Sequence, residues 1–350
     1  MKWDQYKLLF SQKAKKHNLS DEKIGKCLVY AKVLYAKKLP IIYDNEHLSL
    51  LVGYQKDFLL RATNKPKKFY RSFSIPKKSG GKRKIHEPLP SLKEIQRWIL
   101  KKILSRLKIS PYAKAYRITH SIKDNARFHK NQKIVLTVDM NDFFGSLKDK
   151  KVFYFFRSLN YSPSVSKTLT NLCCLNGSLP QGAPTSPTLS NLLFYRCDCR
   201  IAGYVKSKNV RYTRYADDLT FSGNFEPGAV IKFVENVIKD ENLKLNKKKT
   251  KAMFLSNRQE VTGIVVNEKL QVSREIRRKI RQEIHYIRKF GLSSHLEKTE
   301  NVKRNHIRHL LGITNYVIFV NPKDQEVMGY RDYLKKYLTE SNKREISNGD

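Results

Sequence analysis

The sequence has few acidic residues for its basic ones: 31 Asp and Glu stand against 70 Lys and Arg among 350 residues, a formal charge of +39. It also lacks a long apolar run and an amphipathic anchor, so no association with a membrane is expected. The segment from Met1 to Tyr6 lacks the apolar core of a signal peptide, which predicts a cytoplasmic protein. This charge balance is typical of proteins that bind a nucleic-acid backbone with steep salt dependence.

Cysteine is also scarce, and no pair has the spacing of zinc ligands. The five thiols are Cys27, Cys173, Cys174, Cys197 and Cys199. Their odd number and scattered positions predict reduced, mostly buried side chains. His306 and His309 suggest a metal site, but no third ligand is evident from the sequence, and satisfied surface histidines are favoured.

The most informative stretch runs from residue 209 to 223 and carries adjacent carboxylates at Asp217 and Asp218. On either side, β-forming residues recur at every second position, which predicts two strands joined by a tight turn. Two carboxylates about 4 Å apart repel by about 4 kcal/mol at an effective dielectric constant of about 20. One must therefore bind a proton, or a cation must lie between them. A divalent metal fits this need, and the alternative is a solvated acidic turn.

A second carboxylate follows an apolar run of β-branched residues at positions 134–138, which predicts a buried strand ending at Asp139. Asp139 would complete a metal site with Asp217 and Asp218. The alternative, an N-cap for the next helix, suits Asp142 better than a residue at the strand end.

Two basic or glycine-containing loops are candidates for binding a nucleotide. Residues 69–88 predict two short strands joined by a basic loop, from which Lys77 and Arg83 would project as cations able to hold a triphosphate. Solvated turn lysines are the alternative. The loop 179–187 contains three prolines and leads into a helix, and Gly182 in it permits close approach of another group.

A strongly basic helix is predicted over residues 274–290, with an isoleucine stripe that faces the core. Its opposite face carries the arginines Arg277, Arg278 and Arg281. We expect this face to follow the backbone of a nucleic-acid duplex, the alternative being a merely solvated surface.

In chain order, the basic hairpin, Asp139, the Pro-Gln-Gly loop, the Asp217-Asp218 hairpin and the lysine run before Thr250 resemble the successive motifs of reverse transcriptases. Tyr215-Ala-Asp-Asp218 resembles the form found in many bacterial members. Two further segments, Asn125-Ala-Arg-Phe-His129 and Val261-Thr-Gly263, resemble signatures of the retron class. The resemblance covers about residues 65–320.

The resemblance implies an α+β right-hand polymerase with fingers, a palm with an antiparallel sheet, and a helical thumb. We expect a helical N-terminal extension over 1–65, fingers and palm over 66–265, the thumb over 266–338 and a polar tail over 339–350.

The resemblance also implies roles for the site residues. Asp139, Asp217 and Asp218 would be catalytic and hold two Mg²⁺ ions, and Lys249 would donate a proton to the leaving pyrophosphate.

Lys77 and Arg83 would grip the triphosphate of the dNTP. Gln181 and Gly182 would line the nucleotide site. Phe144 would exclude a ribose 2′-hydroxyl and so favour deoxynucleotides.

Retron enzymes copy part of a cognate structured noncoding RNA, priming from a 2′-hydroxyl of a guanosine within it, and leave a branched RNA–DNA product called msDNA. With an associated effector protein they act in antiphage defence. If the chain belongs to this class, Asn125, His129 and the strand of Val261, Thr262 and Gly263 are expected to contact the RNA. The alternative for His129 is a satisfied polar residue between helix and sheet.

Two other functions stay open at this point. One is another bacterial reverse transcriptase, such as a group II intron maturase, which usually carries a further segment after the thumb. The other is a catalytically silent RNA-binding scaffold, against which the presence of Asp139, Asp217 and Asp218 argues.

Overall fold

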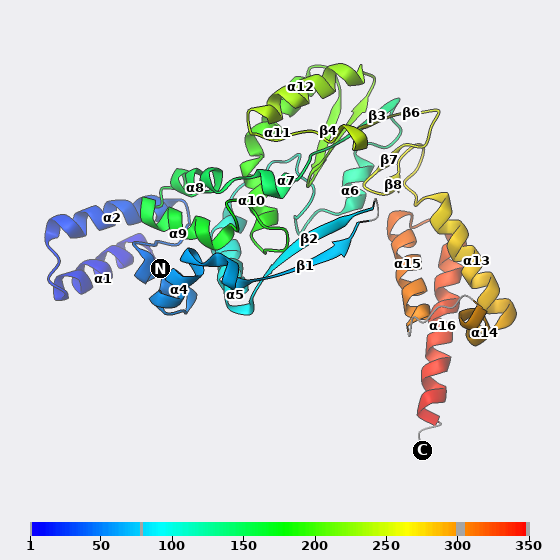
Figure 1. The fold of residues 1–350 in the computed structure, drawn as a ribbon, viewed down its shortest axis with the longest axis horizontal. Coiled ribbons are helices and arrows are strands. Elements are labelled where there is room, and N and C mark those ends of the chain that lie inside the picture. Colours follow the sequence, from blue (N-terminus) through cyan, green and yellow to red (C-terminus); the bar gives the residue numbers. More distant parts are fainter. Residues whose placement is uncertain (1, 78–79, 299–304, 348–350) are drawn as a thin grey trace. The chain divides into compact units, whose positions relative to one another are not determined.

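A computed structural model describes residues 2–77, 80–298 and 305–347 (Figure 1). The chain forms two compact units. The first comprises Met1–Tyr116, Asp139–Tyr204 and Ala229–Lys247, and the second comprises Arg117–Val138, Val205–Gly228 and Lys248–Asp350. Among the described residues, no helix has the length and apolar character needed to cross a membrane.

The first unit begins with the expected N-terminal helices, which are α1 (Trp3–Lys16), α2 (Asp21–Ala36), α3 (Asn45–Val52) and α4 (Lys56–Asn64). Two of them start at a capping side chain. The Ser20 hydroxyl accepts a hydrogen bond from the main-chain N–H of Lys23, and the Asp44 carboxylate accepts one from that of His47. These caps satisfy N–H groups that have no partner within the helix.

A basic β-hairpin follows the helices after a short 3₁₀ turn, η1 (Pro66–Phe69). Strands β1 (Tyr70–Pro76) and β2 (Lys82–Pro88) pair antiparallel over their whole length (Figure 1). Residues 78 and 79 of the predicted loop lie outside the described residues. The hairpin leads into α5 (Pro90–Lys102) and η2 (Leu104–Arg106).

Short helices complete the first unit: α7 (Phe143–Ser146), α8 (Asp149–Ser158), α9 (Pro163–Cys173), α10 (Ser186–Leu193), most of α11 (Tyr195–Lys206) and most of α12 (Pro227–Lys239). All five cysteines are unpaired thiols, and Cys173, Cys174 and Cys197 are buried. Burial raises the pKa of the Cys173 and Cys197 thiols to about 12. The prediction that most of the cysteines are buried is confirmed.

The second unit contains a four-stranded sheet and the helix α6 (Ile122–Arg127). The strands are β3 (Ile134–Asp139), β4 (Arg211–Tyr215), β5 (Asp218–Gly223) and β6 (Lys251–Phe254), in the order β4-β5-β3-β6. The pairs β4–β5 and β3–β6 are antiparallel. A turn of 3₁₀ helix, η3 (Lys247–Lys249), precedes β6. Most residues of β3, β4 and β5 are buried, including neighbours that point to opposite faces of the sheet.

The rest of the second unit is a small hairpin and a group of helices. The hairpin consists of β7 (Glu260–Val261) and β8 (Ile264–Val265), and the helices are α13 (Arg274–Phe290), α14 (Leu292–Lys298), α15 (His306–Val320) and α16 (Gln325–Ser347). Ile280, Ile284 and Ile287 of α13 lie in one apolar core with residues of the hairpin, so the predicted stripe is confirmed. Helix α16 continues to Ser347, through part of the segment that the sequence analysis assigns to a polar tail.

Candidate active site

The two adjacent carboxylates lie where β4 turns into β5. Tyr215 pairs with Asp218, so the two-residue loop consists of Ala216 and Asp217, and only one of the two carboxylates lies in the loop itself. Ala216 adopts a left-handed backbone with φ of 59°, which costs a non-glycine residue about 1–2 kcal/mol. Asp217 and Asp218 are each partly exposed to solvent.

A buried arginine holds this strained turn in place. Arg214 has no exposed surface, and its Nη1 donates a hydrogen bond of 3.0 Å to the main-chain oxygen of Ala216. A buried guanidinium needs hydrogen-bond acceptors, and the turn supplies one of them. The side chain therefore offsets the backbone strain and fixes the loop that carries Asp217.

The third predicted acid, Asp139, is the last residue of β3, and β3 lies next to β5 in the sheet. Its side chain is largely buried, and its main-chain oxygen accepts a hydrogen bond of 2.7 Å from the N–H of Asn246. Asp142 occupies the N-cap position of α7, but its side chain makes no capping hydrogen bond. The strand order thus brings the strands of the three predicted acids together as neighbours.

Within the first unit, the loop of Gln181 and Gly182 is anchored to the basic hairpin. The main-chain N–H of His86 on β2 donates to the oxygen of Gln181 at 2.7 Å. Gly182 has φ of 119°, and a Cβ atom added there would lie 2.7 Å from the main-chain oxygen of His86. Only glycine fits this position, for reasons of both backbone conformation and space.

The other predicted nucleotide-binding residues are Lys77, Arg83 and Phe144. Arg83 lies opposite Ile75 on the exposed part of the hairpin, and Lys77 follows β1 and is also exposed. Phe144 is partly buried, with its ring centroid 6.4 Å from that of Tyr116.

The predicted proton donor lies in the second unit. Lys249 is exposed and ends η3, directly before the strand that pairs with β3.

The predicted RNA-contacting residues Asn125 and His129 are buried beneath the acidic hairpin. The imidazole of His129 is bonded through Nδ1 to the Ser222 hydroxyl on β5 and through Nε2 to the Thr213 hydroxyl on β4, each at 2.7 Å. The Thr213 hydroxyl donates in turn to Oδ1 of Asn125 at 2.6 Å.

Because the Thr213 hydroxyl donates its single proton to Asn125, it must accept from His129, and Nε2 of the ring carries a hydrogen. The Ser222 hydroxyl is the partner of Nδ1. The described geometry is therefore that of the alternative stated for His129, a satisfied polar residue between helix and sheet.

The second signature segment forms the turn of the β7–β8 hairpin. Val261 pairs with Ile264, which leaves Thr262 and Gly263 as a two-residue loop, with φ of 48° and 84° respectively. Positive φ at both positions is the conformation that favours glycine in a tight hairpin. The Val261 side chain belongs to the core, whereas Gly263 is exposed.

Comparison with known proteins identifies the family. A family model described as "Reverse transcriptase (RNA-dependent DNA polymerase)" matches residues 75–315. The chain is 38% identical over 274 residues to the retron Ec86 reverse transcriptase of Escherichia coli, which covers 76% of this chain and 82% of that protein. It is 33% identical over 304 residues to the retron Mx65 reverse transcriptase of Myxococcus xanthus, covering 81% and 69% respectively.

The chain belongs to the retron-type reverse transcriptases. It is an RNA-directed DNA polymerase with the α+β right-hand polymerase fold, and RNA serves as its template. A solved telomerase from Candida albicans superposes with a TM-score of 0.42 at 11% identity, over 77% of this chain and 56% of that one.

In this reverse transcriptase, two of the three predicted duplex-binding arginines are paired within the C-terminal helices. Arg277 contacts Asp324 at 3.3 Å and Glu326 at 2.9 Å, and Arg281 makes hydrogen bonds of 2.7 and 3.0 Å to Glu326. The hydrogen bonds from Arg281 lower the pKa of Glu326 to about 2, against the effect of burial. Arg278 is exposed on the same helix. Arg277 and Arg281 thus join α13 to the start of α16.

Two features of the retron reverse transcriptase were not predicted from its sequence. The first is the role of Arg214 in holding the acidic turn. The sequence pointed to it only by placing a charged residue among the β-formers that precede the turn. The second is a partner for His306, which was expected to be a surface histidine. That expectation is wrong, because His306 is buried and bonded to Glu283, whereas His309 is exposed as expected.

Proposed function

We propose that this reverse transcriptase copies part of a cognate structured noncoding RNA into msDNA, with the DNA primed from a 2′-hydroxyl of a guanosine in that RNA. The observation that carries the proposal is the similarity to retron reverse transcriptases over most of the chain. The formal charge of +39 supports it, because a long structured RNA offers enough phosphates to neutralise such an excess.

Asp139, Asp217 and Asp218 are proposed to hold two Mg²⁺ ions. Carboxylate oxygens are the hard ligands that Mg²⁺ prefers, and no sulphur or imidazole ligand is among the three, so the donor set fits this ion. Bound Mg²⁺ would supply Lewis acidity to the attacking hydroxyl and to the triphosphate. The contribution of the chain is the rigid placement of Asp217 by the bond from Arg214 to the turn.

The incoming dNTP is proposed to be held by the basic hairpin and the loop beside it. Lys77 and Arg83 would contact the triphosphate, since both are exposed cations on the strand pair to which the loop of Gln181 and Gly182 is anchored. Phe144 would exclude a ribose 2′-hydroxyl.

The leaving pyrophosphate needs a proton when the bond to it breaks. Lys249 would donate it, as an exposed ammonium group at the end of η3.

The cognate RNA is proposed to contact the turn of Thr262 and Gly263 and the exposed Arg278. The exposed positions of Gly263 in the turn and of Arg278 on α13 support this. Asn125 and His129 would act on RNA binding through the position of the elements they bond, and Val261 through its place in the core.

The biological setting is proposed from the family. The enzyme would act in the cytoplasm with an associated effector protein, in defence against phage.

The test is to purify the protein from cells that carry its native locus, extract the bound nucleic acid and digest it with RNase and DNase separately. We expect a DNA strand of defined length joined covalently to RNA, and its loss in the Asp217→Asn, Asp218→Asn double variant. Asp332→Asn, which changes an exposed carboxylate on α16, is the matched control and should leave the product unchanged.

The other functions give different results. DNA without a covalent branch to RNA would favour a group II intron-like enzyme. Bound RNA with no DNA in any preparation would favour the silent scaffold.

A further inference from the structure

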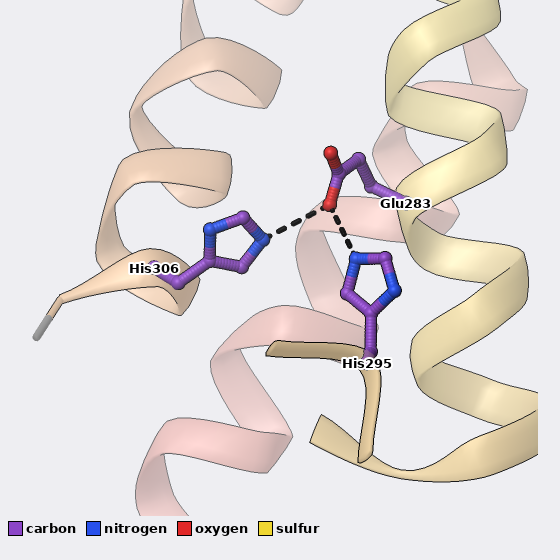
Figure 2. A group of neighbouring side chains, drawn as sticks. All are labelled: Glu283, His295 and His306. Carbon is purple, nitrogen blue, oxygen red and sulfur yellow. Dashed lines mark hydrogen bonds and ion pairs between the residues drawn. The ribbon is translucent and has the colours of Figure 1, made fainter. Parts of the chain in front are cut away.

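Three metal-ligating side chains meet at one point among the C-terminal helices (Figure 2). They are Glu283 on α13, His295 on α14 and His306 at the start of α15. Oε2 of Glu283 lies 2.8 Å from Nε2 of His295 and 3.0 Å from Nε2 of His306. One ligand atom from each residue lies within 4.8 Å of the other two.

The ligand atoms are held by their surroundings. The side chains of His295 and His306 are buried, with 7% and 4% of their surface exposed, and that of Glu283 is 16% exposed. The ring of Tyr286 stacks on that of His295 at 5.8 Å with an interplanar angle of 20°. Burial acts to raise the pKa of Glu283, but the hydrogen bonds from the two histidines outweigh it and lower the pKa below its usual value.

We propose that Glu283, His295 and His306 bind a divalent transition-metal ion of the Zn²⁺ type. Two imidazoles and one carboxylate are a ligand set typical of zinc sites with an open fourth position. Tetrahedral bonds of about 2.0–2.2 Å place ligand atoms about 3.3–3.6 Å apart. The observed separations of 2.8 and 3.0 Å therefore need to open by only a few tenths of an ångström.

The fourth position has room for a water molecule. Glu283 and His295 line a cavity of about 560 Å³, together with Gln282, Tyr286 and Ser294. The cavity gives a water molecule access to the side of the site formed by Glu283 and His295.

The ion would link three separate helices, α13, α14 and α15. The ligands come 12 and 11 residues apart in sequence, from three different helices. Because a metal that binds the folded state stabilises it by mass action, the protein should melt at a higher temperature with the ion than without it. The site is distinct in its residues from Asp139, Asp217 and Asp218, and the inference does not depend on the proposed retron reaction.

The test is to strip the full-length protein with a chelator, return it to a buffer with excess Mg²⁺, which occupies all-oxygen sites, and titrate it with Co²⁺ as a spectroscopic probe. We expect one equivalent to bind with the intense visible bands of tetrahedral Co²⁺, to be displaced by Zn²⁺, and to raise the melting temperature. Glu283→Gln and His306→Ala should each weaken binding by at least about 100-fold, since loss of an outer-shell partner alone costs 10–100-fold.

Two exposed histidines on the same helices provide the matched controls. His285→Ala on α13 and His309→Ala on α15 should leave the Co²⁺ spectrum and affinity unchanged. Glu283→Gln keeps the size and a hydrogen-bond acceptor, and circular dichroism of each variant verifies its fold. Absence of tetrahedral Co²⁺ in the unmodified protein, or its persistence in folded Glu283→Gln and His306→Ala, would overturn the proposal.

Discussion

Replacement of His129 by alanine decides between an RNA-contacting and a structural role for the first retron signature. The ring is fully buried and bonds Ser222 on β5 and Thr213 on β4. Each of these bonds contributes about 1 kcal/mol net, and the Ser222 hydroxyl, left without this partner, costs about 1–3 kcal/mol. Thr213 loses less, because it still donates to Asn125.

With the void left by the ring, we expect His129→Ala to reduce the free energy of unfolding by about 3–4 kcal/mol. For a chain of this size the melting temperature should fall by about 5 °C. The assay is thermal unfolding by circular dichroism, with RNA affinity and DNA synthesis measured well below the melting temperature. His309→Ala, at an exposed position, is the control and should melt like the unmodified protein.

The two roles predict opposite patterns. If His129 supports the hairpin, His129→Ala lowers the melting temperature. It also reduces DNA synthesis more than RNA affinity, because the turn that carries Asp217 and Asp218 loosens. A His129→Ala protein with unchanged melting temperature and selectively weakened RNA binding would refute this reasoning.

Two further substitutions test local features. Gly182→Ala should lower the stability of the protein and raise its KM for dNTPs, because the new Cβ meets the main-chain oxygen of His86. Gly177→Ala is the control: its φ is 74° and no atom lies within 4 Å of the new Cβ, so it should show only the backbone cost of about 1 kcal/mol. Equal effects of the two substitutions would contradict the steric argument. Glu326→Gln should lower the melting temperature by a few degrees at neutral pH, since it breaks the pair with Arg281. Because the pKa of Glu326 in the folded protein is lowered to about 2, its stabilising effect is complete above pH 4.5 and is lost as the pH falls toward 2. The difference in melting temperature between the unmodified protein and Glu326→Gln should therefore shrink over that range. A difference that stays constant with pH would contradict this prediction.

Local patterns predicted the elements that carry the acids. Alternation around Asp217 and Asp218 and the apolar run before Asp139 indicated strands, and the structure has β4, β5 and β3 there. The exact loop could not be predicted, because an alanine with positive φ is locally unfavourable. It is held by the buried Arg214, whose bond to the Ala216 oxygen depends on the folded sheet.

Interactions between distant positions explain what the sequence did not reveal. The basic face of α13 was predicted from its spacing, but the partner of Arg281 lies 45 residues away at Glu326. Likewise, the search for a third ligand beside His306 failed because Glu283 and His295 lie on other helices. Helical spacing reveals neighbours on one helix and contains no information on which helices pack together.

One short segment contacts the elements of both retron signatures. Asn125 and His129 bond the strands of the acidic hairpin, whereas Ala126, between them, lies in the apolar core with Val261 and residues of β8. Helix α6 accordingly contacts β4 on one side and β7 and β8 on another. The segment of α6 and His129 thereby contacts both the acidic β4–β5 hairpin and the β7–β8 hairpin. We infer that this segment keeps the two hairpins in a fixed arrangement, so that a substitution in either signature alters the position of both hairpins.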